Sequence, residues 1–135
     1  MSDSADERHN EISYDPMLSS RFRYGSCNVN GRVFVIEILI ETNGCIAVVS
    51  ENPNPRLGGI TLSVKTDRRV ASSSSLIPER KGSMLASMLG EMLADKLGGI
   101  ALISLYLREE IEAETMKTLI NKVRKMLDRD LTPAV

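Results

Sequence analysis

Histidine is nearly missing from this chain of 135 residues, and tryptophan is missing altogether. The one histidine, His9, lies in a polar stretch near the start, so a Ser-His-Asp or Cys-His catalytic group has no base. Two cysteines without a histidine cluster do not make a zinc site. Glu37 and Glu41 share a strand face but lie roughly 13 Å apart, too far for a retaining carboxylate pair at ~5 Å. We therefore expect no enzyme, no catalytic residue, no metal ligand and no cofactor.

A surplus of charge and a long apolar run are absent as well. The net charge of -1 is atypical of nucleic-acid-binding domains, which normally carry a basic face. No apolar stretch approaches the ~20 residues that span a bilayer. Residues 1–10 lack the apolar centre of a signal peptide. The sequence therefore predicts a soluble cytoplasmic protein that binds neither nucleic acid nor membranes.

The apolar and charged fractions, 42% and 26%, are typical of a globular domain. Residues 1–20 are polar and show no periodicity, so we expect a disordered N-terminal tail there. We predict a single α+β domain over residues 21–129 and a short C-terminal tail over 130–135.

Two Asn-Gly pairs, Asn30-Gly31 and Asn43-Gly44, divide the start of the domain into three strands. Asn-Gly favours the type I′ turn of a two-residue hairpin, so we expect an antiparallel meander with Ala47 opposite Ile40. One face of this sheet is apolar throughout, whereas the other also carries glutamates. A half-apolar second face needs cover from another layer or a partner subunit. The predicted dimer interface on it consists of Val35, Leu39, Ile46 and Val48.

The two cysteines are expected to be free thiols. In this meander Cys27 lies opposite Phe34 and Cys45 opposite Thr42, about eight residues apart on the middle strand. At ~3.4 Å per residue the separation is roughly 27 Å. A disulfide requires α-carbons within ~7 Å of each other.

The remaining elements are predicted from changes of hydrophobic period. Residues 60–66 alternate as a fourth strand. The serine run at 72–77 fits a short fifth strand, because the glycine and lysine frame of a phosphate-binding loop is missing. Apolar spacing predicts a helix from Ser83, a candidate cap, to the glycines that follow Leu97. Residues 100–107 are typical of a buried strand and 109–128 of a second helix. The predicted fold class is α+β, an antiparallel sheet or sandwich of order β-β-β-β-β-α-β-α flanked by two helices.

Methionine recurs every four residues on the first predicted helix, at Met84, Met88 and Met92. The simplest interpretation is that these side chains fill the core, and the alternative is a contact surface. On the second interpretation Met84 and Met88 join the predicted dimer interface.

Three segments together resemble a known family: "VFVIEILIETNGCIAVVS", "SSSSLI" leading into "GSMLASMLGEMLADKLG", and "GIALISLYL" before a charged helix. Over residues 22–128 the chain is similar to the proteasome-assembling chaperone 3 and 4 family, which helps order the α-ring of the 20S proteasome. The resemblance implies a non-enzymatic, archaeal-like chaperone that binds proteasome α-subunits as a homodimer or with a paralogous chaperone. It also implies contact through charged loops, here Glu51, Asn52, Asn54, Arg56, Lys65, Arg68 and Arg69.

A dimeric scaffold of the roadblock or longin kind, serving a GTPase or a membrane complex, is the alternative interpretation. Those folds place a helix between earlier strands. In this sequence four predicted strands precede any helix, and this order favours the chaperone.

Overall fold

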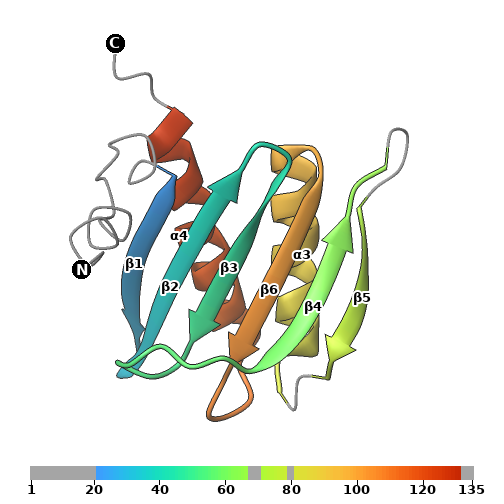
Figure 1. Cartoon of the computed structure of the whole chain (residues 1–135). Coiled ribbons are helices and arrows are strands. Elements are labelled where there is room, and N and C mark those ends of the chain that lie inside the picture. The colour runs from blue at the N-terminus through green and yellow to red at the C-terminus, as the bar shows by residue number, and fades with distance from the viewer. Residues whose placement is uncertain (1–20, 67–70, 79–80, 132–135) are drawn as a thin grey trace, which may run out of the picture.

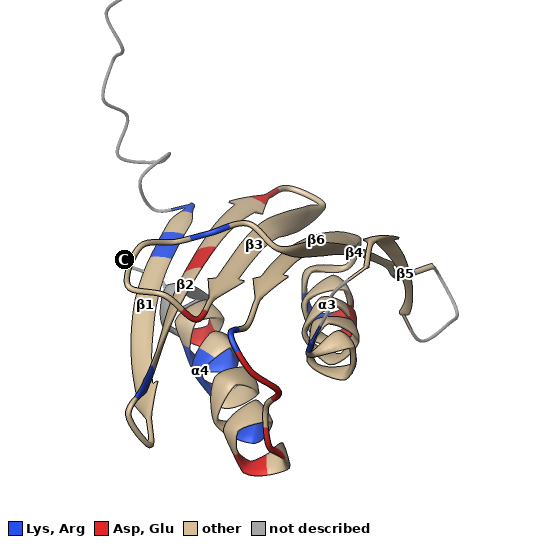
Figure 2. Ribbon diagram, turned by 90° about the horizontal axis from the view of Figure 1, so that it is seen from below, with Lys and Arg blue, Asp and Glu red and all other residues tan. Residues whose placement is uncertain are grey.

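The computed structural model describes residues 21–66, 71–78 and 81–131, with the backbone alone at 129–131. A six-stranded sheet of order β1-β2-β3-β6-β4-β5 carries both helices on one face, while no helix or strand of the described residues covers its other face (Figures 1 and 2). This arrangement confirms the predicted α+β class and element order. The elements are β1 Phe22–Val29, β2 Arg32–Glu41, β3 Gly44–Ser50, β4 Gly59–Val64, β5 Ser72–Ile77, α3 Ser83–Leu97, β6 Ile100–Tyr106 and α4 Ala113–Leu131.

The first hairpin has the predicted geometry and the second is shifted. Asn30 and Gly31 have φ angles of 53° and 82°, as a type I′ turn needs, and Cys27 lies opposite Phe34 as predicted. Between β2 and β3, however, Ala47 lies opposite Ile38 instead of Ile40. The shift of two residues leaves every side chain on its predicted face, because side chains alternate with period two.

Gly44 explains the shift of the second hairpin. It lies within the ladder, paired with both Glu41 and Ile100, rather than in the turn. A Cβ at this position would lie 1.8 Å from the backbone oxygen of Ile100. The glycine is therefore used for close approach of β6 to β3, which is the one parallel pair among the described strands.

The core lies between the sheet and the two helices. Phe34, Ile36 and Ile38 of β2 are fully buried, as are the leucines on the inner side of α3. Burying a side chain of this size contributes about 1.5–3 kcal/mol. The largest fully buried side chains, from five elements, are Phe34, Ile36, Ile38, Val49, Leu85, Leu89, Leu93, Ile103, Leu105, Leu119, Val123 and Met126.

The serine run forms β5 as predicted and joins a small polar network beneath α3. Ser63 is fully buried on β4, and its hydroxyl lies 2.7 Å from that of Ser73. Ser73 donates to Glu91 of α3 at 2.8 Å. Gly90 lets α3 approach this network, since a Cβ there would lie 2.2 Å from Ser63 Oγ.

Helix α3 begins at Ser83 as predicted but without the predicted cap, and α4 begins later than predicted. The residue preceding α3 is Gly82, with a left-handed φ of 80° and no side-chain cap, so the expectation that Ser83 is the cap was wrong. The predicted stop at Gly98 is confirmed. Helix α4 begins at Ala113 instead of residue 109, because the carbonyl oxygens of Glu109 and Glu110 accept hydrogen bonds from Arg32. The predicted N-terminal tail, residues 132–135, Arg68 and Arg69 lie outside the described residues.

Candidate interaction surfaces

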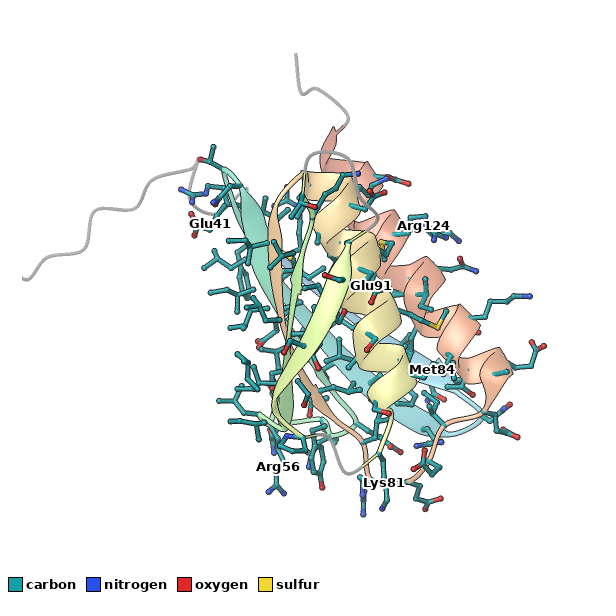
Figure 3. All side chains as sticks on the ribbon, turned by 90° about the vertical axis from the view of Figure 1, so that its right-hand side faces the viewer. Glu41, Arg56, Lys81, Met84, Glu91 and Arg124 are labelled. Atoms are coloured by element: carbon teal, nitrogen blue, oxygen red, sulfur yellow. The ribbon has the colours of Figure 1, made fainter. Side chains whose placement is uncertain are left out.

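The sheet face turned away from the helices, the open face, is largely apolar. Its side chains include Ile46, Ile100 and Tyr24, whose exposed fractions are 47%, 43% and 56%. In Figure 3 these strands are seen edge-on, with side chains projecting away from α3 and α4. The apolar and aromatic members of the open face include Phe22, Tyr24, Val33, Val35, Leu39, Ile46, Val48, Ile60, Leu62, Val64, Ile100, Leu102 and Tyr106.

One row of apolar side chains crosses five strands of this face. Reading from β1 to β4, the paired residues are Phe22, Leu39, Ile46, Leu102 and Leu62. Neighbouring strands lie about 4.8 Å apart, so the row is roughly 19 Å long. A contiguous apolar strip of this size on a monomer is typical of an interaction site.

The predicted dimer residues of the sheet all lie on the open face, in this row or within two rows of it. Leu39 and Ile46 belong to the row, and Val48 lies in the next row, opposite Glu37. Val35 lies one row further and is already 97% buried, with an exposed fraction of 3%. Leu39, Ile46 and Val48 are therefore the three that remain accessible to a partner.

The loop between β3 and β4 covers the lower end of the open face. The backbone N–H of Arg56 donates to Ser50 Oγ at 3.1 Å, and that of Gly58 donates to Ser104 Oγ at 2.9 Å. The Arg56 guanidinium stacks on the ring of Tyr106 at 4.7 Å. This loop forms a rim beside the apolar row, with Arg56 at its outer side in Figure 3.

Glu51 is not the exposed loop charge that the sequence suggested. Its exposed fraction is 7%, and its carboxylate accepts hydrogen bonds from Arg32 Nη2 at 2.6 Å and Nε at 2.8 Å. The backbone N–H of Arg108 donates to it at 2.9 Å. The bidentate hydrogen bond from Arg32 is the main cause that lowers the pKa of Glu51. This ion pair, the Arg32–Glu51 clamp, fastens β2 to the segment before α4.

The other predicted contact residues do not form one site. Asn54 and Arg56 are exposed at the lower end of β4, whereas Lys65 follows its upper end and pairs with Asp95 of α3. Asn52 is half-buried and its side chain accepts from the N–H of Asn54 at 3.0 Å. Six residues of β4 separate the two loops, about 20 Å at ~3.3 Å per residue.

Met84 and Met88 lie on the helix side of the molecule, opposite the open face. Their exposed fractions are 64% and 44%, so the interpretation as core filling was wrong for both, while Met92 packs partly against the core. Figure 3 shows Met84 on α3, away from the sheet. One flat interface cannot contain Met84 and Ile46 together. The spacing of four residues predicts that the methionines share one face of α3, but it does not predict whether that face is turned to the core or to solvent.

A pocket of about 270 Å³ lies at the upper end of the open face, beside Glu41, Asn43, Ile46 and Leu62. Cys45 also lines it, and burial raises the pKa of its thiol to about 12. Such a thiol stays protonated near neutral pH and is a poor nucleophile. Both cysteines are free, as predicted.

The described residues form neither a metal-binding cluster nor a membrane-spanning helix. No three side chains of histidine, cysteine, aspartate or glutamate lie together as metal ligands in these ranges. None of the helices within them is long and apolar enough to cross a membrane.

Comparison with known proteins yields a likeness in fold. No protein-family model matches the sequence, and no curated protein matches it either. A solved structure that is similar belongs to a chaperone complex for yeast 20S proteasome assembly. The two chains superimpose with a TM-score of 0.60 at 10% sequence identity, over 82% of this chain and 98% of the yeast chain.

Proposed function

We propose that this chain is an assembly chaperone of the 20S proteasome, a member of the proteasome-assembling chaperone 3 and 4 family that acts in the cytoplasm. The observation that carries the proposal is the apolar open face, on a fold shared with a yeast proteasome assembly chaperone complex. In this role the protein works by surface complementarity, binds proteasome α-subunits and catalyses no reaction. Five described strands precede α3, an order unlike the roadblock and longin scaffolds.

A second copy, or a paralogous chaperone, covers the open face in this proposal. Six strands at about 4.8 Å spacing and roughly 20 Å length give a flat area on the order of 500 Å². Standard interfaces bury about 800 Å² on each partner, so the flat area of this face is the larger part of one, and the 51–58 loop lies beside it to add to the contact. Two sheets packed face to face would bury the apolar row from both sides.

The dimer is tested with one charge placed on either side of the molecule. Ile46→Glu puts a carboxylate in the middle of the apolar row, and Met84→Glu is the matched control on the helix side. An unpaired buried charge costs about 3 kcal/mol or more, so Ile46→Glu should weaken dimerisation at least about a hundredfold. Light scattering should give twice the monomer mass of 14.9 kDa for the wild type and Met84→Glu, and the monomer mass for Ile46→Glu.

Binding to isolated proteasome α-subunits tests the function itself. We expect titration to detect binding of at least one α-subunit, and release of the chaperone after the ring has matured. Arg56→Glu should slow association, most at low salt, because exposed rim charges mainly set the association rate. If no α-subunit of the same organism binds, the chaperone proposal is wrong, whatever the oligomeric state.

A further inference from the structure

The outer surface of the first two turns of α3 is unusually apolar for a helix that faces solvent. Residues 83–90 contain no charged side chain, and Met84 and Met88 are exposed within them. Solvent-facing positions of amphipathic helices normally carry charged or polar residues. Exposed methionines are adaptable contact groups, as binding surfaces for varied helices use them.

Met84 lines a groove beside the N-terminal end of α3, and Met88 lies one helical turn further along the same helix. The open part of this groove has a volume of about 360 Å³ and lies between the start of α3 and the segment that enters α4. Met84 lines one wall, and Ile111 and Met116 line the other. At the far end Lys96 of α3 and Asp128 of α4 form an ion pair at 2.8 Å that bridges the helices. We call this feature the methionine groove, lined by Gly82, Ser83, Met84, Glu110, Ile111, Ala113 and Met116.

The rim of the methionine groove is acidic. Figure 2 shows the acidic residues gathered at the start of α4 and on the segment before it. All four glutamates between residues 109 and 114 are exposed, against the three cations Lys81, Arg108 and Lys117 of the described residues nearby. Arg32 lies behind this segment, but the Glu51 carboxylate already pairs with it. The exposed charge facing an incoming partner is therefore negative.

This charge selects among the segments that could lie in the groove. Residues 1–20 of the chain contain five acidic residues and one arginine, so the rim repels them. A second copy that presents the same end of its helices brings a second acidic rim. A basic helix from another protein meets no such repulsion, and the groove is open at its acidic end.

We propose that the methionine groove binds an amphipathic helix of a partner protein, with its apolar side chains on Met84, Met88 and Met116 and its lysines or arginines at the rim. Met84 and Met88 lie about 6 Å apart along α3, one helical turn, which fits apolar residues at i and i+4 of the incoming helix. The groove lies on the helix side, so each copy in a dimer joined by its open faces retains one. The inference stands whether or not the protein acts on proteasomes.

Methyl NMR of the full chain can test this directly, because its seven methionines give seven separable probes. The ligands are two synthetic 18-residue amphipathic helices of one apolar pattern, one built on leucine and lysine and the other on leucine and glutamate. We expect the lysine peptide to shift the signals of Met84, Met88 and Met116, and to leave Met126, buried in the core, in place. The glutamate peptide should bind at least tenfold more weakly.

Three variants separate the groove from general charge attraction. Met84→Gln with Met88→Gln should weaken the lysine peptide about tenfold, whereas Ile46→Gln on the open face should leave its affinity unchanged. Glu110→Gln with Glu112→Gln should weaken it several-fold and reduce its salt dependence. The proposal is overturned if both peptides bind equally, if the methionine variants bind like the wild type, or if anionic lipid vesicles shift these methyl signals and the lysine peptide does not.

Discussion

Replacing Arg32 with alanine tests how strongly one ion pair holds the lower end of the sheet to α4. The substitution leaves the Glu51 carboxylate almost completely buried with backbone donors only, among them the Arg108 N–H at 2.9 Å. It also removes the donors to the carbonyl oxygens of Glu109 and Glu110, each 3.0 Å away. The segment that precedes α4 then loses its attachment to β2.

The expected loss follows from the contacts of the Arg32–Glu51 clamp. A hydrogen bond to a charged group contributes about 1.5–3 kcal/mol, and Arg32 makes two with Glu51. The arginine side chain is 23% exposed, so water replaces part of this interaction in the variant. We expect Arg32→Ala to lower the free energy of unfolding by about 2–3 kcal/mol. For a domain of this size that lowers Tm by about 8–12 °C.

A double-mutant cycle identifies the clamp as the cause. Glu51→Gln keeps an oxygen that accepts from Arg32 and Arg108, so it should cost only about 1 kcal/mol. Combined with Arg32→Ala it removes the unpaired buried charge, and the double variant should be more stable than the sum of the two changes predicts. Urea unfolding followed by circular dichroism measures all four proteins. An Arg32→Ala loss below about 0.5 kcal/mol, or a coupling near zero, would refute the reasoning.

The clamp also predicts how stability depends on pH. Arg32 lowers the pKa of Glu51 in the folded state below its ordinary value of about 4.5. The folded state therefore binds this proton less readily than the unfolded state, so the contribution is complete above pH about 4.5 and is lost as pH falls through the folded pKa. Glu51→Gln should flatten the loss of stability between about pH 5 and pH 2. An equal acid loss in both proteins contradicts this assignment.

Three further predictions concern other parts of the molecule. Gly90→Ala should destabilise the fold by about 1–3 kcal/mol in urea unfolding despite its better helix propensity, and adding Ser63→Ala should restore most of this loss. Cys45 should resist iodoacetamide at pH 8 until urea unfolds the chain, since a pKa of about 12 leaves roughly one thiolate in ten thousand; rapid labelling of native Cys45 would contradict its burial. Deletion of residues 1–18 should leave Tm within a few degrees by differential scanning fluorimetry, and a larger drop would show that they pack on the domain.

Local signals were sufficient where an element is defined by its own residues. The helix α3 was predicted from Ser83 to its glycine stop because apolar spacing and the left-handed preference of Gly98 are both local. The Asn30-Gly31 turn was predicted for the same reason. The serine strand β5 also followed from composition alone.

The misses arise from contacts between residues far apart in the chain. The position of Gly44 is set by Ile100, and the start of α4 is set by Arg32, 78 residues before Glu110. Glu51 lies in a segment whose proline-rich composition indicates an exposed loop, yet its carboxylate is buried in a bidentate hydrogen bond with Arg32. No local pattern contains these pairings, so the clamp was missing from the sequence interpretation.

The two exposed methionines show a different limit. Their spacing on α3 is the same as that of a core stripe, and only the placement of the sheet beneath Leu85 and Leu89 decides that Met84 and Met88 point outward. The sequence could therefore predict that both methionines are contact residues, but it could not show that they lie on a different side of the molecule from the open face. Only the placement of the sheet and the helices in two layers shows that Met84 and Met88 cannot share one flat interface with Ile46.

The place of β6 in the sheet has a consequence for how the chain is made. It lies between β3 and β4 but is the last strand in sequence, separated from β4 by β5 and α3. As the polypeptide leaves the ribosome, β1-β2-β3 and β4-β5 can form only as two separate ribbons. The apolar strands β3 and β4 then each have one edge whose N–H and C=O groups lack their partner β6. Such edges pair readily with other chains. The interval between synthesis of Ser50 and synthesis of Tyr106 is therefore when this protein is most open to aggregation, and insertion of β6 closes both edges in one step.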